Sequence, residues 1–352
     1  MTAVQAYVPH FGRHPRRPGL LIGGACLLLS LLGSACSSHS GPTIVLYNGQ
    51  HPQTTDALVS AFEQATGINV VVSNGDEDQL GEQIETEGAN SPADVFYTEN
   101  SQILEALQQK HLLAGVDGAT LAETPARFDS PQGDWVGVSA RVSVLIYNPS
   151  LISASELPTA VLDMADSKYR GKIAIADAET DFEPVVTSVL RTYGQARTLQ
   201  WLQGLKANAA GHIYADNETI ADEVNRGEVA FGIINQYYWY RLRAQDGNSG
   251  MHSQIAYFAA RDPGYVLDVS GAGVLASSRH QALAQRFLAF LVSKAGQEII
   301  AHSTSFEYPI ASGVSTAQPE TPFDKLQPNS ITVAELGSGL QAFDLLHQVQ
   351  LI

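Results

Sequence analysis

Short apolar runs alternate with amphipathic stretches from residue 43 to residue 109. Thr43 to Tyr47 (TIVLY) has the β-rich composition of a strand, whereas Asp56 to Thr66 spaces its apolar residues as a helix does. Gly67 is expected to end that helix. This alternation is typical of a parallel sheet covered by helices. The predicted elements of this first series are strands over 43–47, 68–72 and 94–97 and helices over 56–66, 79–87 and 103–109.

A longer extended segment, Trp135 to Tyr147, is predicted to be a strand that crosses from one region of the fold to another. A second α/β series follows it, so we expect two lobes. Val266 to Leu275 is predicted to return the chain to the first lobe, and helices between Gln281 and Ala301 are predicted to close the structure. The second series consists of strands over 173–176, 213–215 and 229–234 and helices over 183–193 and 196–205.

The first residues have the features of an export signal. Three arginines precede an apolar stretch from Leu20 to Leu32, and no acidic residue occurs before Cys36. This stretch is too short to span a bilayer comfortably. Its end, LGSAC, resembles a bacterial lipobox, although Gly33 stands where the usual motif has leucine. We predict a signal peptide over 1–35, lipidation at Cys36 and a polar tether over 36–42; the alternative is plain secretion with cleavage nearby.

Composition narrows the class of protein. Both cysteines, Cys26 and Cys36, lie in or beside the leader, so no disulfide is expected in the folded body. The formal charge is -16, and loss of the three leader arginines makes it more negative. This acidity argues against nucleic acid as a partner and is compatible with a cationic ligand. The residues that follow the leader are enough for roughly two domains.

Candidate ligands follow the ends of the predicted strands, where open α/β sheets bind their ligands. They are His51, Glu99, Tyr237 and Tyr238. Two phenols beside an imidazole and a carboxylate suit a hard, highly charged ion better than zinc, and Fe(III) fits best. Two phenolates and one carboxylate would balance its charge and leave two octahedral positions open. Taken singly, each residue has a plainer reading, as an exposed turn histidine, a helix N-terminal carboxylate or packed aromatics.

These residues lie in segments that resemble the bacterial ferric-ion-binding proteins, which are the iron-binding components of ABC importers. YNGQH (47–51), SPADVFYTEN (91–100) and INQYYW (234–239) carry the resemblance. It extends over nearly all of the mature chain through DWVGVSAR (134–141), YRGKIAIAD (169–177), RDPG (261–264), SGAGVL (270–275) and FEYPI (306–310).

The resemblance implies an α/β, two-lobed periplasmic-binding-protein fold (type II-like), with a central cleft and a two-strand hinge. It implies that His51, Glu99, Tyr237 and Tyr238 bind Fe(III), and that a monomer delivers the iron to a membrane permease with its cytoplasmic ATPase. The N-terminal lobe is expected over 43–138 and 267–315 and the C-terminal lobe over 139–266 and 316–352.

Two other classes of function remain as alternatives. One is a binding protein for another small solute, such as an oxyanion, a polyamine or a sugar, because one fold serves many ligands. The other is an enzyme. The sequence contains no nucleophile elbow, no HExxH, no Walker loop and no paired cysteines, so we predict that the protein is not an enzyme.

The sequence leaves open whether a separate small anion binds beside the iron. The best-known branch of the family completes the coordination of iron with phosphate, which small neutral groups hold. Here the corresponding segment is Glu179-Thr180-Asp181, and two carboxylates would repel phosphate, although the helix beginning near Gln236 would attract it. We expect Asp181 or Glu179 to bind the iron or to shift the choice of anion, unless both point to solvent. Further candidates for this role are Asn100, Asn217, Asn235 and Arg141, which is alternatively a surface arginine.

Overall fold

The computed structural model describes residues 41–318 and 320–352. The predicted signal peptide over 1–35, the lipidation at Cys36 and all of the tether except its last two residues lie outside the described residues. None of the helices in the described ranges has the length and apolar character needed to cross a membrane.

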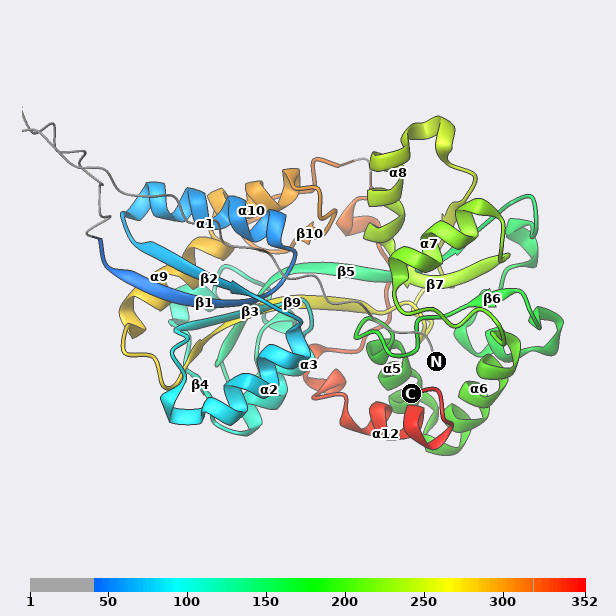
Figure 1. Ribbon diagram of the computed structural model, residues 1–352, viewed down its shortest axis with the longest axis horizontal. Coiled ribbons are helices and arrows are strands. Elements are labelled where there is room, and N and C mark those ends of the chain that lie inside the picture. Colours follow the sequence, from blue (N-terminus) through cyan, green and yellow to red (C-terminus); the bar gives the residue numbers. More distant parts are fainter. Residues whose placement is uncertain (1–40, 319) are drawn as a thin grey trace, which may run out of the picture. The chain divides into compact units, whose positions relative to one another are not determined.

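The first α/β series forms as the sequence predicts. β1 (Thr43–Gly49) pairs in parallel with β2 (Asn69–Asn74) and with β3 (Val95–Thr98). The helices between and after these strands are α1 (Pro52–Thr66), α2 (Glu77–Glu87) and α3 (Ser101–Gln109). Gly67 ends α1 in the left-handed conformation, with φ 69°. In Figure 1, α1 lies on one side of these strands and α2 and α3 on the other.

The strands of the first series are parallel, as predicted, but the complete sheet is mixed. β9 (Leu267–Leu275) lies between β3 and β5 (Trp135–Tyr147) and is antiparallel to both. The order of the main strands is β2-β1-β3-β9-β5-β7-β6, where β7 is Phe231–Asn235 and β6 is Ile173–Ala174. The sheet is mixed because the chain returns from the second series and enters the first sheet from the opposite direction. Short strands pair at the sides: β4 (Leu113–Ala114) with β9, and β8 (Gln254–Ala256) and β10 (Tyr308–Pro309) with β5.

β5 connects the two α/β series. Its first part pairs with β9, and its last five residues, from Ser143 to Tyr147, pair with β7 (Phe231–Asn235). Every residue of β5 is buried, including the polar residues Ser139, Arg141 and Ser143 that interrupt its apolar sequence. Figure 1 shows β5 and β9 running beside each other from the strands of the first series toward β7.

The second series surrounds β6 (Ile173–Ala174) and β7, which are parallel. The strand predicted over 213–215 is wrong, because Ile213 makes only one isolated bridge, to Ile175, and is 40% exposed. The residues 217–226 and 340–348, for which no element was predicted, are helical. The helices of this part are α5 (Glu183–Tyr193), α6 (Gln195–Asn208), α7 (Asn217–Arg226), α8 (Gln236–Gly250), α11 (Val333–Leu336) and α12 (Leu340–Gln348).

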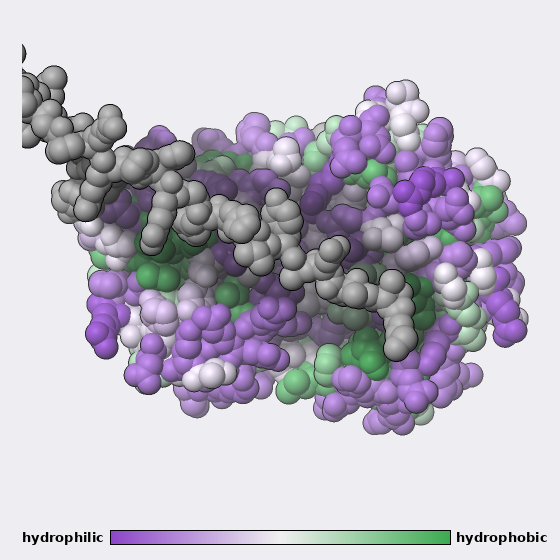
Figure 2. All heavy atoms as spheres, in the orientation of Figure 1, coloured by the Kyte–Doolittle hydropathy of each residue, from purple (hydrophilic) through white to green (hydrophobic). Residues whose placement is uncertain are grey.

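Separate apolar cores stabilise the first and the second α/β series. Phe62 of α1 packs edge-on against Phe287 of α9 (Gln281–Val292), with ring centroids 5.0 Å apart. α10 (Lys294–His302) follows α9 and also contacts α1, and α4 (Gly118–Leu121) contacts α9. A second cluster joins Val186 of α5 with Leu345 and Leu346 of α12. The face of the molecule in Figure 2 is mostly hydrophilic, with small apolar patches, as the acidic composition predicts.

Candidate metal centre

An open cleft of about 680 Å³ lies where several strands of both series end. Its walls include His51, Glu99, Asp181 and Tyr238. These residues follow β1, β3, β6 and β7, as expected for a ligand site at the carboxyl ends of strands.

His51 is held at the junction of β1 and α1. Gly49 permits a close approach there, because a Cβ atom at this position would lie 2.6 Å from the Cβ of Glu77. The carbonyl of His51 accepts from the amides of Thr54 and Thr55 at 3.1 Å, but its side chain does not cap the helix. The imidazole is 13% exposed, so the reading as an exposed turn residue is wrong. Its Nδ1 lies 3.0 Å from Oε1 of Glu99, and its buried Nε2 has no hydrogen-bond partner among residues 41–318 and 320–352.

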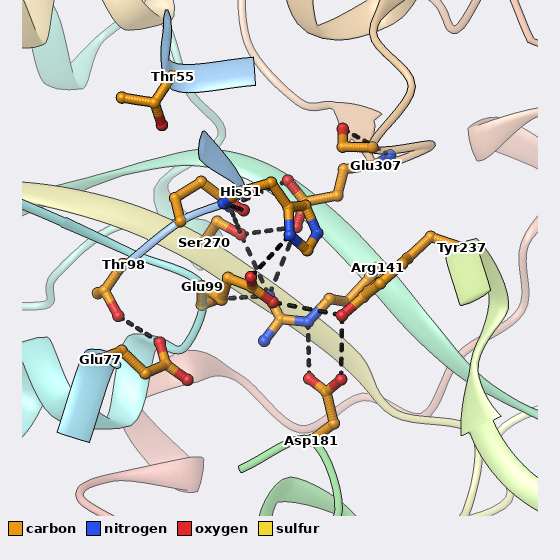
Figure 3. A network of polar contacts seen from close by, with 12 residues as sticks. His51, Thr55, Glu77, Thr98, Glu99, Arg141, Asp181, Tyr237, Ser270 and Glu307 are labelled. Carbon is orange, nitrogen blue, oxygen red and sulfur yellow. Dashed lines mark hydrogen bonds and ion pairs between the residues drawn. The ribbon is translucent and has the colours of Figure 1, made fainter. Parts of the chain in front are cut away.

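Glu99 connects His51 to the tyrosine pair. Its Oε1 contacts the imidazole, and its Oε2 accepts from the hydroxyl of Tyr237 at 3.3 Å. Glu99 is supplied by the turn between β3 and α3, whereas Tyr237 is in the first turn of α8. The imidazole and the Tyr237 ring also meet edge-on, with centroids 5.2 Å apart. Side chains from both α/β series therefore converge, as Figure 3 shows.

Tyr237 and Tyr238 present their hydroxyls to one carboxylate oxygen. Both residues are buried, at 0% and 6% exposure, and their ring centroids are 4.1 Å apart. Oδ2 of Asp181 accepts from Tyr237 at 3.2 Å and from Tyr238 at 2.9 Å. Tyr238 also lies 2.9 Å from Oε1 of Glu179. The alternative that both Glu179 and Asp181 point to solvent is therefore wrong.

Arg141 lies beneath this group and is completely buried in β5, so the surface alternative is wrong. Its guanidinium is 3.2 Å from Asp181 and 3.2 Å from Asp268. It also donates to Oδ1 of Asn100 at 2.6 Å and to the carbonyl of Glu99. Figure 3 shows Arg141 between Asp181 and the Glu99 side of the site, so this arginine offsets the negative charge of the carboxylates.

The other polar residues predicted to hold an anion or to act as an extra ligand lie at different positions in the structure. The side chain of Asn100 is hydrogen-bonded to Arg141 and to Glu77, and Nδ2 of Asn217 lies 3.4 Å from Oδ2 of Asp181. Asn235 immediately precedes α8, and its buried Nδ2 has no partner within the described part of the chain. Thr180 lines the cleft between Glu179 and Asp181.

Burial and neighbouring charge shift the ionisation of these groups. Burial, followed by the charge of Asp181, raises the pKa of Tyr237 and of Tyr238 well above the ordinary phenol value. Burial and then Asp181 raise the pKa of Glu179 to about 9. Burial alone would lower the pKa of His51, but the negative charge of Glu99 outweighs this effect, so the pKa is raised. Burial raises the pKa of Glu99, but His51 outweighs this and lowers it. Without a cation, both phenols therefore keep their protons at neutral pH.

Several polar residues around the site were not predicted. Asp268 faces Arg141 in the register of β9 with β5, and Glu307 lies 3.9 Å from the same guanidinium. Glu77, whose pKa burial raises to about 7, accepts from the side chains of Thr98 and Asn100. Arg241 lies 5.9 Å from the ring centroids of both tyrosines. Arg241 follows Tyr237 by four residues, which places both on the same face of a helix, and this spacing was the sequence signal for the contact.

The donor set determines which cation fits. Within residues 41–318 and 320–352, no three His, Cys, Asp or Glu side chains are grouped to hold a metal ion. A metal site here therefore depends on the two phenol oxygens. Phenolate and carboxylate oxygens with one imidazole favour a hard, highly charged cation over zinc.

Comparison with known proteins identifies the class. The model of the bacterial extracellular solute-binding proteins matches residues 57–325. The chain belongs to this family. The solute-binding protein is 36% identical over 312 residues to the Fe(3+)-binding periplasmic protein of Serratia marcescens, with 89% of this chain and 91% of the relative covered. This similarity confirms the resemblance to the ferric-ion-binding proteins.

Two solved structures agree in fold. Iron-bound HitA from Pseudomonas aeruginosa is 40% identical, with a TM-score of 0.83, and the match covers 88% of this chain and 99% of HitA. The Trichodesmium protein IdiA (FutA), in complex with iron and citrate ligands, is 30% identical, with a TM-score of 0.78 and coverage of 87% and 99%. They confirm the predicted two-lobed α/β fold class.

Family membership also establishes the general role and the location of this solute-binding protein. Its relatives are binding components of transport and not enzymes, which confirms the prediction that the chain is not an enzyme. The family is extracellular, so the extracytoplasmic part of the predicted location is confirmed as well. Its members are the solute-binding components of ABC importers.

Proposed function

We propose that the protein captures Fe(III) between its lobes with His51, Glu99, Tyr237 and Tyr238 and delivers it to the permease of an ABC importer. The observation that carries this proposal is that His51, Glu99 and Tyr238 line one cleft and that Glu99 accepts from Tyr237, while the buried Nε2 of His51 has no hydrogen-bond partner in the described part of the chain. A buried nitrogen with a free lone pair is costly unless a ligand uses it. Iron-binding relatives cover nearly the same length of chain.

The chemistry of the donors explains how iron would be held. Both phenols are neutral in the absence of a cation, because burial and carboxylates raise their pKa values. A trivalent ion stabilises phenolate strongly enough to displace these protons, as metals do for coordinated thiols and water. Two phenolates and Glu99 then balance the three charges of the ion, and His51 binds as a neutral imidazole.

Capture would proceed by closure of two lobes about β5 and β9. The proposed lobe boundaries are those predicted from the sequence, 43–138 with 267–315 and 139–266 with 316–352. Packing supports this division, because the side chains of α12 share a core with α5, whereas α9 packs against α1. His51 and Glu99 belong to the first lobe and Tyr237 and Tyr238 to the second.

The absorption spectrum tests the proposal for iron. Iron-tyrosinate coordination produces a visible charge-transfer band, so the iron-loaded protein should be coloured and contain one iron per chain by metal analysis. Removal of the iron with a chelator should abolish the colour. Colourless protein that binds a sugar, a polyamine or an oxyanion in place of iron would support the other solute class.

Lipidation at Cys36 is the second part of the proposal. Its support is the leader with its arginines, apolar stretch and LGSAC end. The parent protein should fractionate with membranes and carry a lipid-modified N-terminus by mass spectrometry, whereas Cys36→Ser should remain unlipidated. Parent protein found free of membranes and without lipid would instead indicate plain secretion.

A further inference from the structure

The two phenols of the proposed iron site share a third protein oxygen. Oδ2 of Asp181 lies 3.2 Å from the hydroxyl of Tyr237 and 2.9 Å from that of Tyr238. Neighbouring ligands of an octahedral ion with bonds of about 2.0–2.1 Å stand about 2.9 Å apart, because the bonds meet at right angles. Oδ2 of Asp181 therefore lies at about the distance from each phenol oxygen that neighbouring ligands of one octahedral ion would have.

We propose that Asp181 is itself an iron ligand, so that this protein binds Fe(III) tightly without a separate small anion. The inference rests on the proposed function and concerns the coordination positions that the four predicted ligands leave open. The solved Trichodesmium relative, which contains citrate together with iron, provides the contrasting case.

Asp181 is fixed in place for this role. Its side chain is 4% exposed, and its Oδ1 lies 3.2 Å from Nε of Arg141. The other oxygen is left to face the two phenols, with Asn217 at 3.4 Å as a further neighbour. The phenol protons satisfy Oδ2 when no cation is bound. Once both phenols have lost their protons, Oδ2 of Asp181 lies about 3 Å from two further negatively charged oxygens, and a cation bound among them offsets this repulsion.

The surroundings disfavour a separate anion. Glu179 lies beside Asp181 on the wall of the cleft, with Oε1 2.9 Å from the hydroxyl of Tyr238, so a carboxyl group already occupies the hydrogen-bonding position next to this phenol. The cations close to the described site are already paired, Arg141 with Asp181, Asp268 and Glu307, and Arg241 with Glu218 at 3.2 Å. The positive N-terminal end of α8 attracts an anion, but Asp181 already accepts from the side chains of Tyr237 and Tyr238, which belong to the first turn of this helix.

Charge leads to the same conclusion. Two phenolates, Glu99 and Asp181 would carry four negative charges against the three of iron, and Arg141 lies where it can offset the fourth. Because Asp268 and Glu307 also contact Arg141, no positive charge is left over for phosphate or citrate.

The test is the Fe(III) affinity of the parent protein and of Asp181→Asn, measured by competition with a chelator in buffer free of added anions and again with phosphate, bicarbonate or citrate. The parent affinity should change less than about twofold with any of these anions. Asp181→Asn should bind at least about tenfold more weakly without anions, since even indirect partners of a metal contribute 10–100-fold, and an added anion should recover much of the loss.

Asp177→Asn is the matched control, because Asp177 is a buried carboxylate of the same loop with no hydrogen bond to either phenol among the described residues. Circular dichroism and retention of the tyrosinate band would show that Asp181→Asn is folded and still binds iron. Tenfold or stronger enhancement of the parent affinity by an anion would overturn the inference, as would parent-like, anion-independent affinity in Asp181→Asn. Absence of any tyrosinate band in the parent would instead refute the proposed function.

Discussion

Tyr238→Phe should weaken Fe(III) binding by at least about 100-fold and reduce the intensity of the visible band. The substitution keeps the aromatic ring, which packs 4.1 Å from that of Tyr237, and removes only the oxygen that faces Asp181 and Glu179. Loss of an indirect partner of a metal already costs 10–100-fold in affinity, and loss of a direct phenolate ligand should cost more. Chelator competition measures the affinity, and titration with iron measures the band.

Tyr193→Phe is the control for this prediction. Tyr193 is 36% exposed at the end of α5 and lies outside the cleft, so its substitution should leave iron binding unchanged. Urea denaturation should show that Tyr238→Phe is folded, with a loss of stability of about 1–3 kcal/mol from the unsatisfied carboxylates. Parent-like affinity and colour in Tyr238→Phe would show that this phenol is not a ligand.

Arg141→Met should lower the free energy of unfolding of the iron-free protein by about 3–5 kcal/mol, because it leaves buried carboxylates without their cation. Asp181 and Asp268 each lie 3.2 Å from the guanidinium, and Glu307 lies 3.9 Å from it. Methionine has similar length and removes the charge without opening a large cavity. Urea denaturation is the measurement, and iron must be absent because a bound ligand stabilises the native state by mass action.

Arg127→Met provides the comparison for Arg141. Arg127 is exposed and lies over the ring of Phe128, with its guanidinium carbon 4.4 Å from the centroid. Its substitution should change the free energy of unfolding by less than about 1 kcal/mol, because only one exposed cation–π contact is lost. Equal denaturation midpoints for Arg141→Met and the parent would mean that the buried charge cluster does not depend on this arginine.

Local patterns were sufficient to predict most elements of the fold. The bounds of β5 and α5 match the prediction, because a long run rich in β-branched residues and a regular amphipathic stretch determine them. The antiparallel β9 was missed as such, because the direction of a strand depends on where the chain returns and not on its own residues. The segment 213–215 failed because a short apolar sequence forms a strand only where a neighbouring edge continues beside it.

The candidate site was predictable where its residues follow strands. His51, Glu99 and the tyrosine pair have this position in the sequence, and the family resemblance assigned their role. Asp268 and Glu307 could not be found in this way, because their contact with Arg141 depends on strand register and on a loop far along the chain. The orientation of Asp181 likewise needed the structure, since the sequence left it open between the site and solvent.

The most direct test of the account is a crystal structure of the iron-loaded protein with anomalous scattering recorded at the iron edge. The expected result is one iron bonded to Nε2 of His51, a carboxylate oxygen of Glu99 and the phenol oxygens of Tyr237 and Tyr238. Iron bound elsewhere, or bound in the cleft without the two tyrosines, would contradict it.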